Sequence, residues 1–245
     1  MDKEKAPKEK NRSKRSSFLL LPQLITTLIG TCIGIFLTIG VTYCSEKNDK
    51  EEMARKSVLM TIHNLDVSIR SMETLVGEMA RQDSIFSYVR ENYASGQSVG
   101  EDTLDLFISS LYSHNVHPID TSAEDIFSTN FEIWRYIDDP KVIGRIANCY
   151  SIMNKCASEY ERIEKEKYDS FINFYDSCSP AVRQSDEELT QELLSQNRVI
   201  RIIEAMPAEI KLLRLLIDSA KALNERNKKE LGVSQAELDE IGELI

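Results

Sequence analysis

The chain carries no charged residue between Arg15 and Glu46, and most of the stretch from Phe18 to Cys44 is apolar. About 20 apolar helical residues are enough to cross the ~30 Å hydrocarbon core of a bilayer. A helix buried in a soluble core is seldom apolar all round over such a length. We therefore predict a transmembrane helix over residues 18–44, which brings the chain into contact with the lipid bilayer.

Two processed segments are the alternatives to an uncleaved anchor. A cleaved signal peptide has an apolar stretch of about 7–15 residues. The stretch here is longer, and Thr38-Ile39-Gly40 is only a weak cleavage site. A lipoprotein would be modified at Cys44, but Tyr43 stands where such sites have a small residue. The pattern favours an uncleaved signal anchor.

The charge of the flanks predicts the orientation of this anchor. Residues 1–17 hold seven basic and three acidic residues, a net charge of +4, whereas the rest of the chain holds 23 basic and 37 acidic residues, a net charge of −14. Basic residues beside a membrane segment stay on the cytoplasmic side. We expect a basic cytoplasmic tail over residues 1–17 and a single-pass protein of the inner membrane, with its C-terminal domain in the periplasm.

Small residues recur every four positions within the predicted anchor. They are Thr26, Gly30, Gly34, Thr38 and Thr42. On a helix this spacing makes one ridge of small side chains, which lets a second membrane helix approach closely. Glycine and threonine are also simply common in membrane helices. We interpret the ridge as a packing face for self-association or for another membrane protein.

Beyond a polar stalk over residues 45–57, the apolar residues follow a heptad pattern. The positions of this seam are Val58, Ile62, Leu65, Ile69, Met72, Val76 and Met79. Alternating steps of four and three residues, held for three repeats, are the minimum for a coiled coil. Asp83 predicts a break after the seam, followed by a short helix.

Further helix signals follow along the chain. Asp139-Pro140 predicts the start of the longest helix, with the aspartate as N-cap and the proline at the first helical position. Glu164 and Lys167 interrupt the apolar seam of that helix, either because the helix extends past its partners there or because a polar layer sets the register. Ser185 opens another helix, in which Pro207 predicts a kink or a restart. Ser234 opens a last short helix with Glu237 in a capping box.

These patterns predict an all-α fold: an N-terminal transmembrane helix followed by a long-helix bundle with heptad seams, forming an extracytoplasmic domain over residues 58–245. No stretch alternates apolar and polar residues over the length of a strand. The seams can meet within one chain or between chains, and we favour packing within one chain.

The sequence contains no constellation of residues that predicts catalysis, a cofactor or a metal. His114 and His117 form a close pair, but a structural metal site needs about four ligands and a catalytic site three. Cys149, Cys156 and Cys178 are an odd number of cysteines in an oxidising compartment, so a disulfide to another chain and buried free thiols are both open, the latter being favoured. The acidic domain argues against nucleic acid as a partner.

The layout resembles the uncharacterised single-pass, signal-anchored helical membrane proteins of Bacteroidota. The similarity lies in the anchor segment Ile33–Gly40, in Ile62-His63-Asn64-Leu65-Asp66, in Phe131–Ile137 and in Ile146–Tyr150. It implies an envelope protein, with no catalytic residues to carry over. Cys149 and the Lys- and Glu-rich continuation beyond Tyr160 depart from the pattern.

Taken together, these features predict a non-enzymatic bitopic membrane protein whose helical domain acts as a scaffold or accessory subunit in a membrane assembly. The alternative is a ligand-sensing helical bundle, in which Trp134, Tyr136 and Tyr150 would line a pocket.

We expect the double substitution G30I/G34I to weaken self-association of the anchor, because two β-branched side chains would hold the helix backbones apart. A membrane two-hybrid assay measures this association. A signal that survives the substitution would show that the ridge is not the interface.

Overall fold

The computed structural model describes the backbone of residues 13–114, 122–129, 134–137 and 139–242. It describes the side chains of residues 47–242 except 115–123, 126, 130–133 and 138. The chain divides into two compact units, residues 1–53 and residues 54–245. Within the described residues, no helix is long and apolar enough to cross a membrane. The predicted anchor over residues 18–44 lies outside the residues whose side chains are described.

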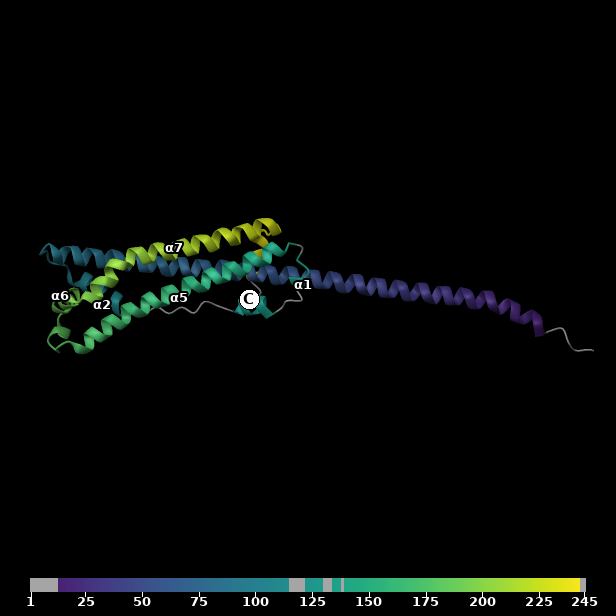
Figure 1. The fold of residues 1–245 in the computed structure, drawn as a ribbon, viewed down its shortest axis with the longest axis horizontal. Helices are drawn as coiled ribbons and strands as arrows, with labels where there is room; N and C mark the ends of the chain where they lie inside the picture. The colour runs from purple at the N-terminus through teal and green to yellow at the C-terminus, as the bar shows by residue number, and fades with distance from the viewer. Residues whose placement is uncertain (1–12, 115–121, 130–133, 138, 243–245) are drawn as a thin grey trace, which may run out of the picture. The chain divides into compact units, whose positions relative to one another are not determined.

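The described part of the chain is all-helical, without strands, as the sequence predicts (Figure 1). The elements are α1 (Ser13–Ala94), α2 (Glu101–Tyr112), α3 (Ser122–Thr129), α5 (Pro140–Ser177), the 3-10 helix η1 (Val182–Gln184), α6 (Asp186–Ser195), α7 (Asn197–Leu231) and α8 (Gln235–Gly242). The second unit is a bundle of three long helices, formed by α1 from Ala54 onward, α5 and α7, with the short helices packed on it.

Two apolar clusters form the core of this bundle. One joins the start of the α1 seam, around Ile62, to the first turns of α5, around Ile146, and to α8. The other joins the rest of the seam to the C-terminal half of α5, to α2 and α6, and to α7 from Val199 to Ala220. Within the unit, α1 and α5 therefore run in the same direction and α7 runs antiparallel to both.

The heptad seam of α1 lies inside this core. All seven predicted positions, from Val58 to Met79, are buried. The sequence left open whether the seams meet within one chain or between chains. The side chains of this seam pack within a single chain. Burial of seven such side chains supplies much of the hydrophobic stabilisation of the unit, at about 1.5–3 kcal/mol for each large side chain.

Two predicted helix boundaries are wrong. The chain does not break at Asp83: α1 continues to Ala94, because Phe86 and Val89 extend the buried seam beyond that position. The next break falls at Gln196, which is extended and separates α6 from α7. Of the kink or restart predicted at Pro207, the restart is wrong, because α7 continues through this exposed proline, and the kink stays a prediction.

The predicted caps are confirmed. The side chain of Asp139 accepts a hydrogen bond from the backbone N–H of Lys141 at 2.9 Å, with Pro140 at the first helical position. The backbone N–H of Ser234 donates to Oε2 of Glu237 at 2.8 Å, and the Ser234 hydroxyl caps the helix in return. The carboxylate of Glu237 also pairs with Arg55 of α1, so the cap holds α8 against the bundle. The pKa of Glu237 is lowered to about 2 by these hydrogen bonds, first of all by the one from the Ser234 backbone.

A buried ion pair crosses the second core cluster at the interruption of the α5 seam. Lys167 is 0% exposed and Glu164 is 1% exposed, and their Nζ and Oε1 atoms are 2.8 Å apart. Lys167 also donates to Oε1 of Gln82 on α1 at 2.8 Å and to the hydroxyl of Ser113 at 3.4 Å. Burial lowers the pKa of Lys167, and the Glu164 carboxylate opposes that shift. The sequence left open whether α5 extends past its partners at Glu164 and Lys167 or whether these residues form a polar layer. The structure has the polar layer.

We expect Lys167→Ala to lower the free energy of unfolding by roughly 3–5 kcal/mol, because it leaves the Glu164 carboxylate buried without its cation. The apolar replacement E164L/K167M should cost much less, since neither charge then remains in the core. Chemical denaturation followed by circular dichroism measures both. The matched control is Lys165→Ala, an exposed lysine on the same helix, for which we expect a change within about 0.5 kcal/mol. A cost for Lys167→Ala as small as that of the control would contradict the prediction.

Candidate functional site

The structure places the sequence-predicted site residues in two ways. The small-residue ridge, Thr26, Gly30, Gly34, Thr38 and Thr42, lies outside the residues whose side chains are described, and its packing role stays a prediction. The α1 seam is described, and its side chains pack inside the bundle. Neither set forms a surface on the described part of the domain.

The histidines are dispersed over the described residues. His114 is exposed and its ring contacts Tyr168, with centroids 5.5 Å apart. His117 lies outside the described residues, and His63 lies beside Gly242. Among the described side chains, no group of three or more His, Cys, Asp or Glu residues could hold a metal ion.

Two of the three cysteines of the domain are buried between α5 and α7, and all three are free. Sγ of Cys149 lies 3.6 Å from the carbonyl oxygen of Ala220, and Sγ of Cys156 lies 3.9 Å from that of Leu213. Burial raises the pKa of Cys149 to about 12 and that of Cys156 to about 11. A thiol with such a pKa is almost entirely protonated at neutral pH, so it is a poor nucleophile. Cys178 is half-buried at the end of α5.

The aromatic residues that would line a sensing pocket are mostly packed against one another. Trp134 and Tyr150 are buried in the first core cluster, and Phe127 packs on both rings. The indole N–H of Trp134 donates to the carbonyl oxygen of Phe127 at 2.9 Å. Trp134 and Tyr150 thus pack into the core, whereas Tyr136 is half-buried.

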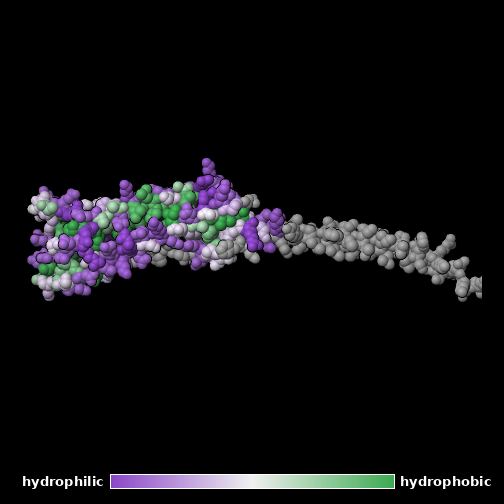
Figure 2. Space-filling view, viewed as in Figure 1, coloured by the Kyte–Doolittle hydropathy of each residue, from purple (hydrophilic) through white to green (hydrophobic). Residues whose placement is uncertain are grey.

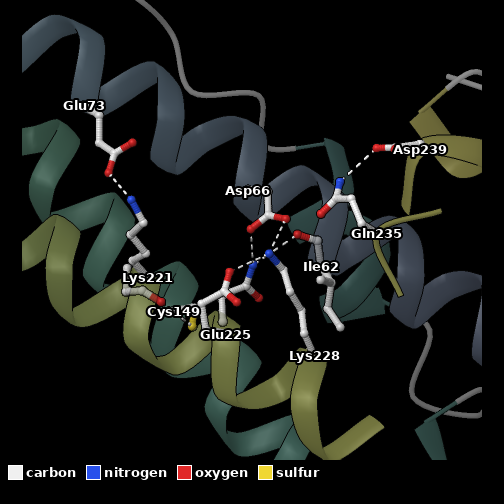
Figure 3. A network of polar contacts seen from close by, with 11 residues as sticks. Ile62, Asp66, Glu73, Cys149, Lys221, Glu225, Lys228, Gln235 and Asp239 are labelled. Carbon is white, nitrogen blue, oxygen red and sulfur yellow. Dashed lines mark hydrogen bonds and ion pairs between the residues drawn. The ribbon is translucent and has the colours of Figure 1, made fainter. Parts of the chain in front are cut away.

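A polar network joins α1 to the C-terminal half of α7 (Figure 3). The amide of Asn224 donates to Oδ1 of Asp66 at 2.8 Å and to the carbonyl oxygen of Ile62 at 3.2 Å. Lys228 pairs with Asp66 at 2.7 Å and with Glu225 at 2.7 Å. About two turns further along α1, Glu73 pairs with Lys221 of α7 at 2.7 Å. These contacts hold α7 to α1 in one register, and the side of α7 opposite α1 is exposed.

That opposite side of α7 carries a second apolar row, which we call the outer seam. Its six positions are Ala205, Ala208, Leu212, Leu215, Ser219 and Ala222. They alternate in steps of three and four residues, and all six are exposed, with Leu212 at 39% and Leu215 at 57%. The hydroxyl of Ser219 donates to the carbonyl oxygen of Leu215 at 2.7 Å, so its hydrogen bond stays within the helix. Figure 2 shows apolar surface gathered along α7.

The outer seam lies on the far side of α7 from the core. The buried positions of the same helix, from Met206 to Asn227, also recur every three or four residues. Each residue of an α-helix turns by about 100°, and the mean directions of the two rows therefore differ by roughly 140°. Sequence reasoning missed the outer seam, although the spacing of its six positions can be read from the sequence.

Charged residues flank the outer seam. Several are already paired within the chain: Glu204 with Arg90 at 3.3 Å, Glu209 with Arg162 at 2.8 Å, and Glu225 with Lys228. Lys211 and Asp218 are exposed, and neither has an ion pair with any residue that the structure describes. The seam is thus bordered near its centre by one cation and one anion that have no direct ion pair with a described residue, although Lys221 lies within electrostatic range of Asp218.

An open groove of about 540 Å³ lies between α5 and the first turns of α7. Its lining includes Arg162, Arg198 and Arg201 together with Glu166 and Glu209. Arg162 is neutralised by Glu159, Glu166 and Glu209. The lining side chains thus carry three positive and two negative charges, and Arg198 and Arg201 are the two cations among them without an ion pair to a described carboxylate.

Comparisons with known proteins add no assignment. No protein-family model matches the chain, no curated protein matches it, and no solved structure matches it. The resemblance to signal-anchored proteins of Bacteroidota stays a prediction, and the function has to be argued from the geometry above.

We expect Cys178 to react first with a thiol reagent in the native protein, and Cys149 and Cys156 to react only after unfolding. The reason is that the raised pKa values of Cys149 and Cys156 leave little reactive thiolate, and burial blocks access of the reagent to both side chains. Titration with a chromogenic disulfide at pH 8, in a C32S/C44S background with and without denaturant, counts the reactive thiols. Rapid reaction of Cys149 or Cys156 in the folded protein would contradict the assignment of both as packing residues.

Proposed function

We propose that this chain is a non-enzymatic, membrane-anchored scaffold or accessory subunit whose helical domain assembles through the outer seam of α7. One observation carries the proposal: α7 has an apolar heptad row on its solvent side in addition to the row that faces the core. Every position of this row is exposed on the described domain.

Exposed apolar residues are informative only when they are contiguous. A single exposed leucine is ordinary on a protein surface. Six positions at heptad spacing over five turns form a continuous apolar stripe, and a stripe of that kind is the surface by which one helix binds another. The helix that carries it is held rigidly, because ion pairs to α1 and α5 fix its register.

The membrane part of the proposal rests on the sequence. Residues 18–44 supply an apolar stretch of sufficient length, and residues 1–17 supply the basic flank that favours a cytoplasmic N-terminus. An anchor confines the domain to a surface, which raises the effective concentration of every partner confined to the same surface. The domain itself would then be periplasmic.

The second candidate function, ligand sensing, has one supporting observation in the groove between α5 and α7. Arg198 and Arg201 line it and are not paired with any described carboxylate, so the ligand class that it fits is a small anion. The groove is open and lies next to the N-terminal end of the outer seam, so a helix bound to the seam would pass close to it.

We expect L212E/L215E to abolish the assembly made through the domain, because two carboxylates would have to be desolvated in an apolar helix contact. Affinity purification of the full-length protein from native membranes in mild detergent gives the mass and composition of the complex. The matched control is Val67→Glu, which introduces the same side chain at an exposed apolar position of α1.

Loss of the larger species for L212E/L215E, but not for Val67→Glu, supports the outer seam as the assembly surface. An unchanged complex in the double variant would overturn the proposal. Circular dichroism of each variant verifies the fold, for which we expect little change because all three positions are exposed.

A further inference from the structure

We propose that the partner of the outer seam is a second copy of this chain, bound through the same face of α7 with the two helices antiparallel. The inference rests on the proposed function, since it identifies the partner of that surface. A symmetric dimer brings one patch onto the identical patch of the other copy, so the patch must be complementary to itself.

The outer seam has this self-complementarity in the size of its side chains. Along the chain it reads small, small, Leu, Leu, small, small, and reading it backward gives the same order. In an antiparallel pair centred between Leu212 and Leu215, Leu212 of each copy faces Leu215 of the other. Ala205 then faces Ala222, and Ala208 faces Ser219. The leucines fill the centre, and the small residues let the helix ends approach closely.

The flanking charges fit the same arrangement. In an antiparallel coiled coil, the residues that precede the first seam position of each heptad meet their counterparts on the other helix. With the register above, Lys211 of each copy lies beside Asp218 of the other, so the pair forms twice. These are the two flanking residues that have no ion pair within the described part of the chain. The next such positions, Glu204 and Glu225, would repel, but Arg90 and Lys228 already neutralise them.

A parallel pair is less favourable on the same surface. Each residue that precedes a seam position would then meet the residue five positions later on the other helix. Lys211 would lie beside Leu216, Asp218 beside Leu223, and Glu204 beside Glu209. No opposite charges would meet, and Lys211 and Asp218 would each be partly desolvated by an apolar neighbour.

A contact along one helix face is small. Stable interfaces between proteins bury about 1,200–2,000 Å² in total, and an interface formed by six seam positions lies at the low end of that range or below it. The pair would therefore depend on confinement of both copies by their anchors.

Charge exchange at Lys211 and Asp218 tests the pairing. Two differently tagged full-length chains are produced together, each with G30I/G34I to remove contacts made by the anchor ridge, and the fraction that co-purifies is measured. Lys211→Asp paired with itself, and Asp218→Lys paired with itself, should each co-purify roughly 10-fold less than the unexchanged chains, since two attractions become two repulsions. Lys211→Asp paired with Asp218→Lys should recover, because opposite charges meet again at both positions.

Cysteine cross-linking gives a second measurement of direction. Ala205 and Ala222 are 17 residues apart, which is about 25 Å along a helix. In a background with Cys32, Cys44 and Cys178 replaced by serine, an antiparallel pair cross-links an A205C chain to an A222C chain. A parallel pair instead cross-links each of these chains to its own kind.

The antiparallel dimer is overturned if the mixed charge pair stays as weak as the single variants, or if A205C cross-links chiefly to A205C. Loss of assembly in L212E/L215E together with either result would leave the outer seam as an assembly surface for a different partner. Assembly retained in L212E/L215E would overturn the surface and the dimer together.

Discussion

The domain depends on one constraint: three long helices must bury apolar seams of nearly equal period against one another. The seam of α1 from Val58 to Met79 supplies the central row. The helices α5, parallel to α1, and α7, antiparallel to it, pack against this row. Seams of this period interdigitate when helices cross at small angles, as in left-handed bundles. The short helices α2, α6 and α8 cover the ends of the bundle, where the three long rows alone would leave apolar side chains in water.

Polar groups inside the bundle fix the register of these seams. An apolar row by itself tolerates a shift of one heptad, because similar side chains would meet again. The Glu164–Lys167 pair with Gln82, and the Asp66–Asn224–Lys228 contacts, each match in only one alignment. A shifted helix would leave these groups buried without partners, at a cost of several kcal/mol for a buried charge. The two polar layers lie in the two halves of the bundle, so both ends of the helices are aligned.

Because the register of α7 is fixed, the outer seam is always the side of this helix that remains exposed. One side of the helix is held by the core and by ion pairs, and the opposite side presents the outer seam in a rigid row. A seam on a rigid helix can bind a partner without the cost of ordering a flexible segment. Because α7 is packed against α1 and α5, the bundle also fixes the positions of Leu212, Leu215 and the flanking charges relative to one another.

Much of this architecture follows from the sequence alone. The period of apolar residues determined that the domain is helical and which residues of α1 are buried, and local chemistry determined the caps at Asp139 and Ser234, because these signals act within a few residues. The sequence did not place the break at Gln196, and it left open a restart at Pro207 that the structure does not have, since the burial of Met206 and Ile210 on either side of the proline depends on tertiary packing. Nor did it separate the two apolar rows of α7, because residues such as Leu213 and Leu215 have the same hydrophobicity. Only the tertiary structure decided which row faces the core, since that depends on where α1 and α5 lie, and with it which row remains on the surface.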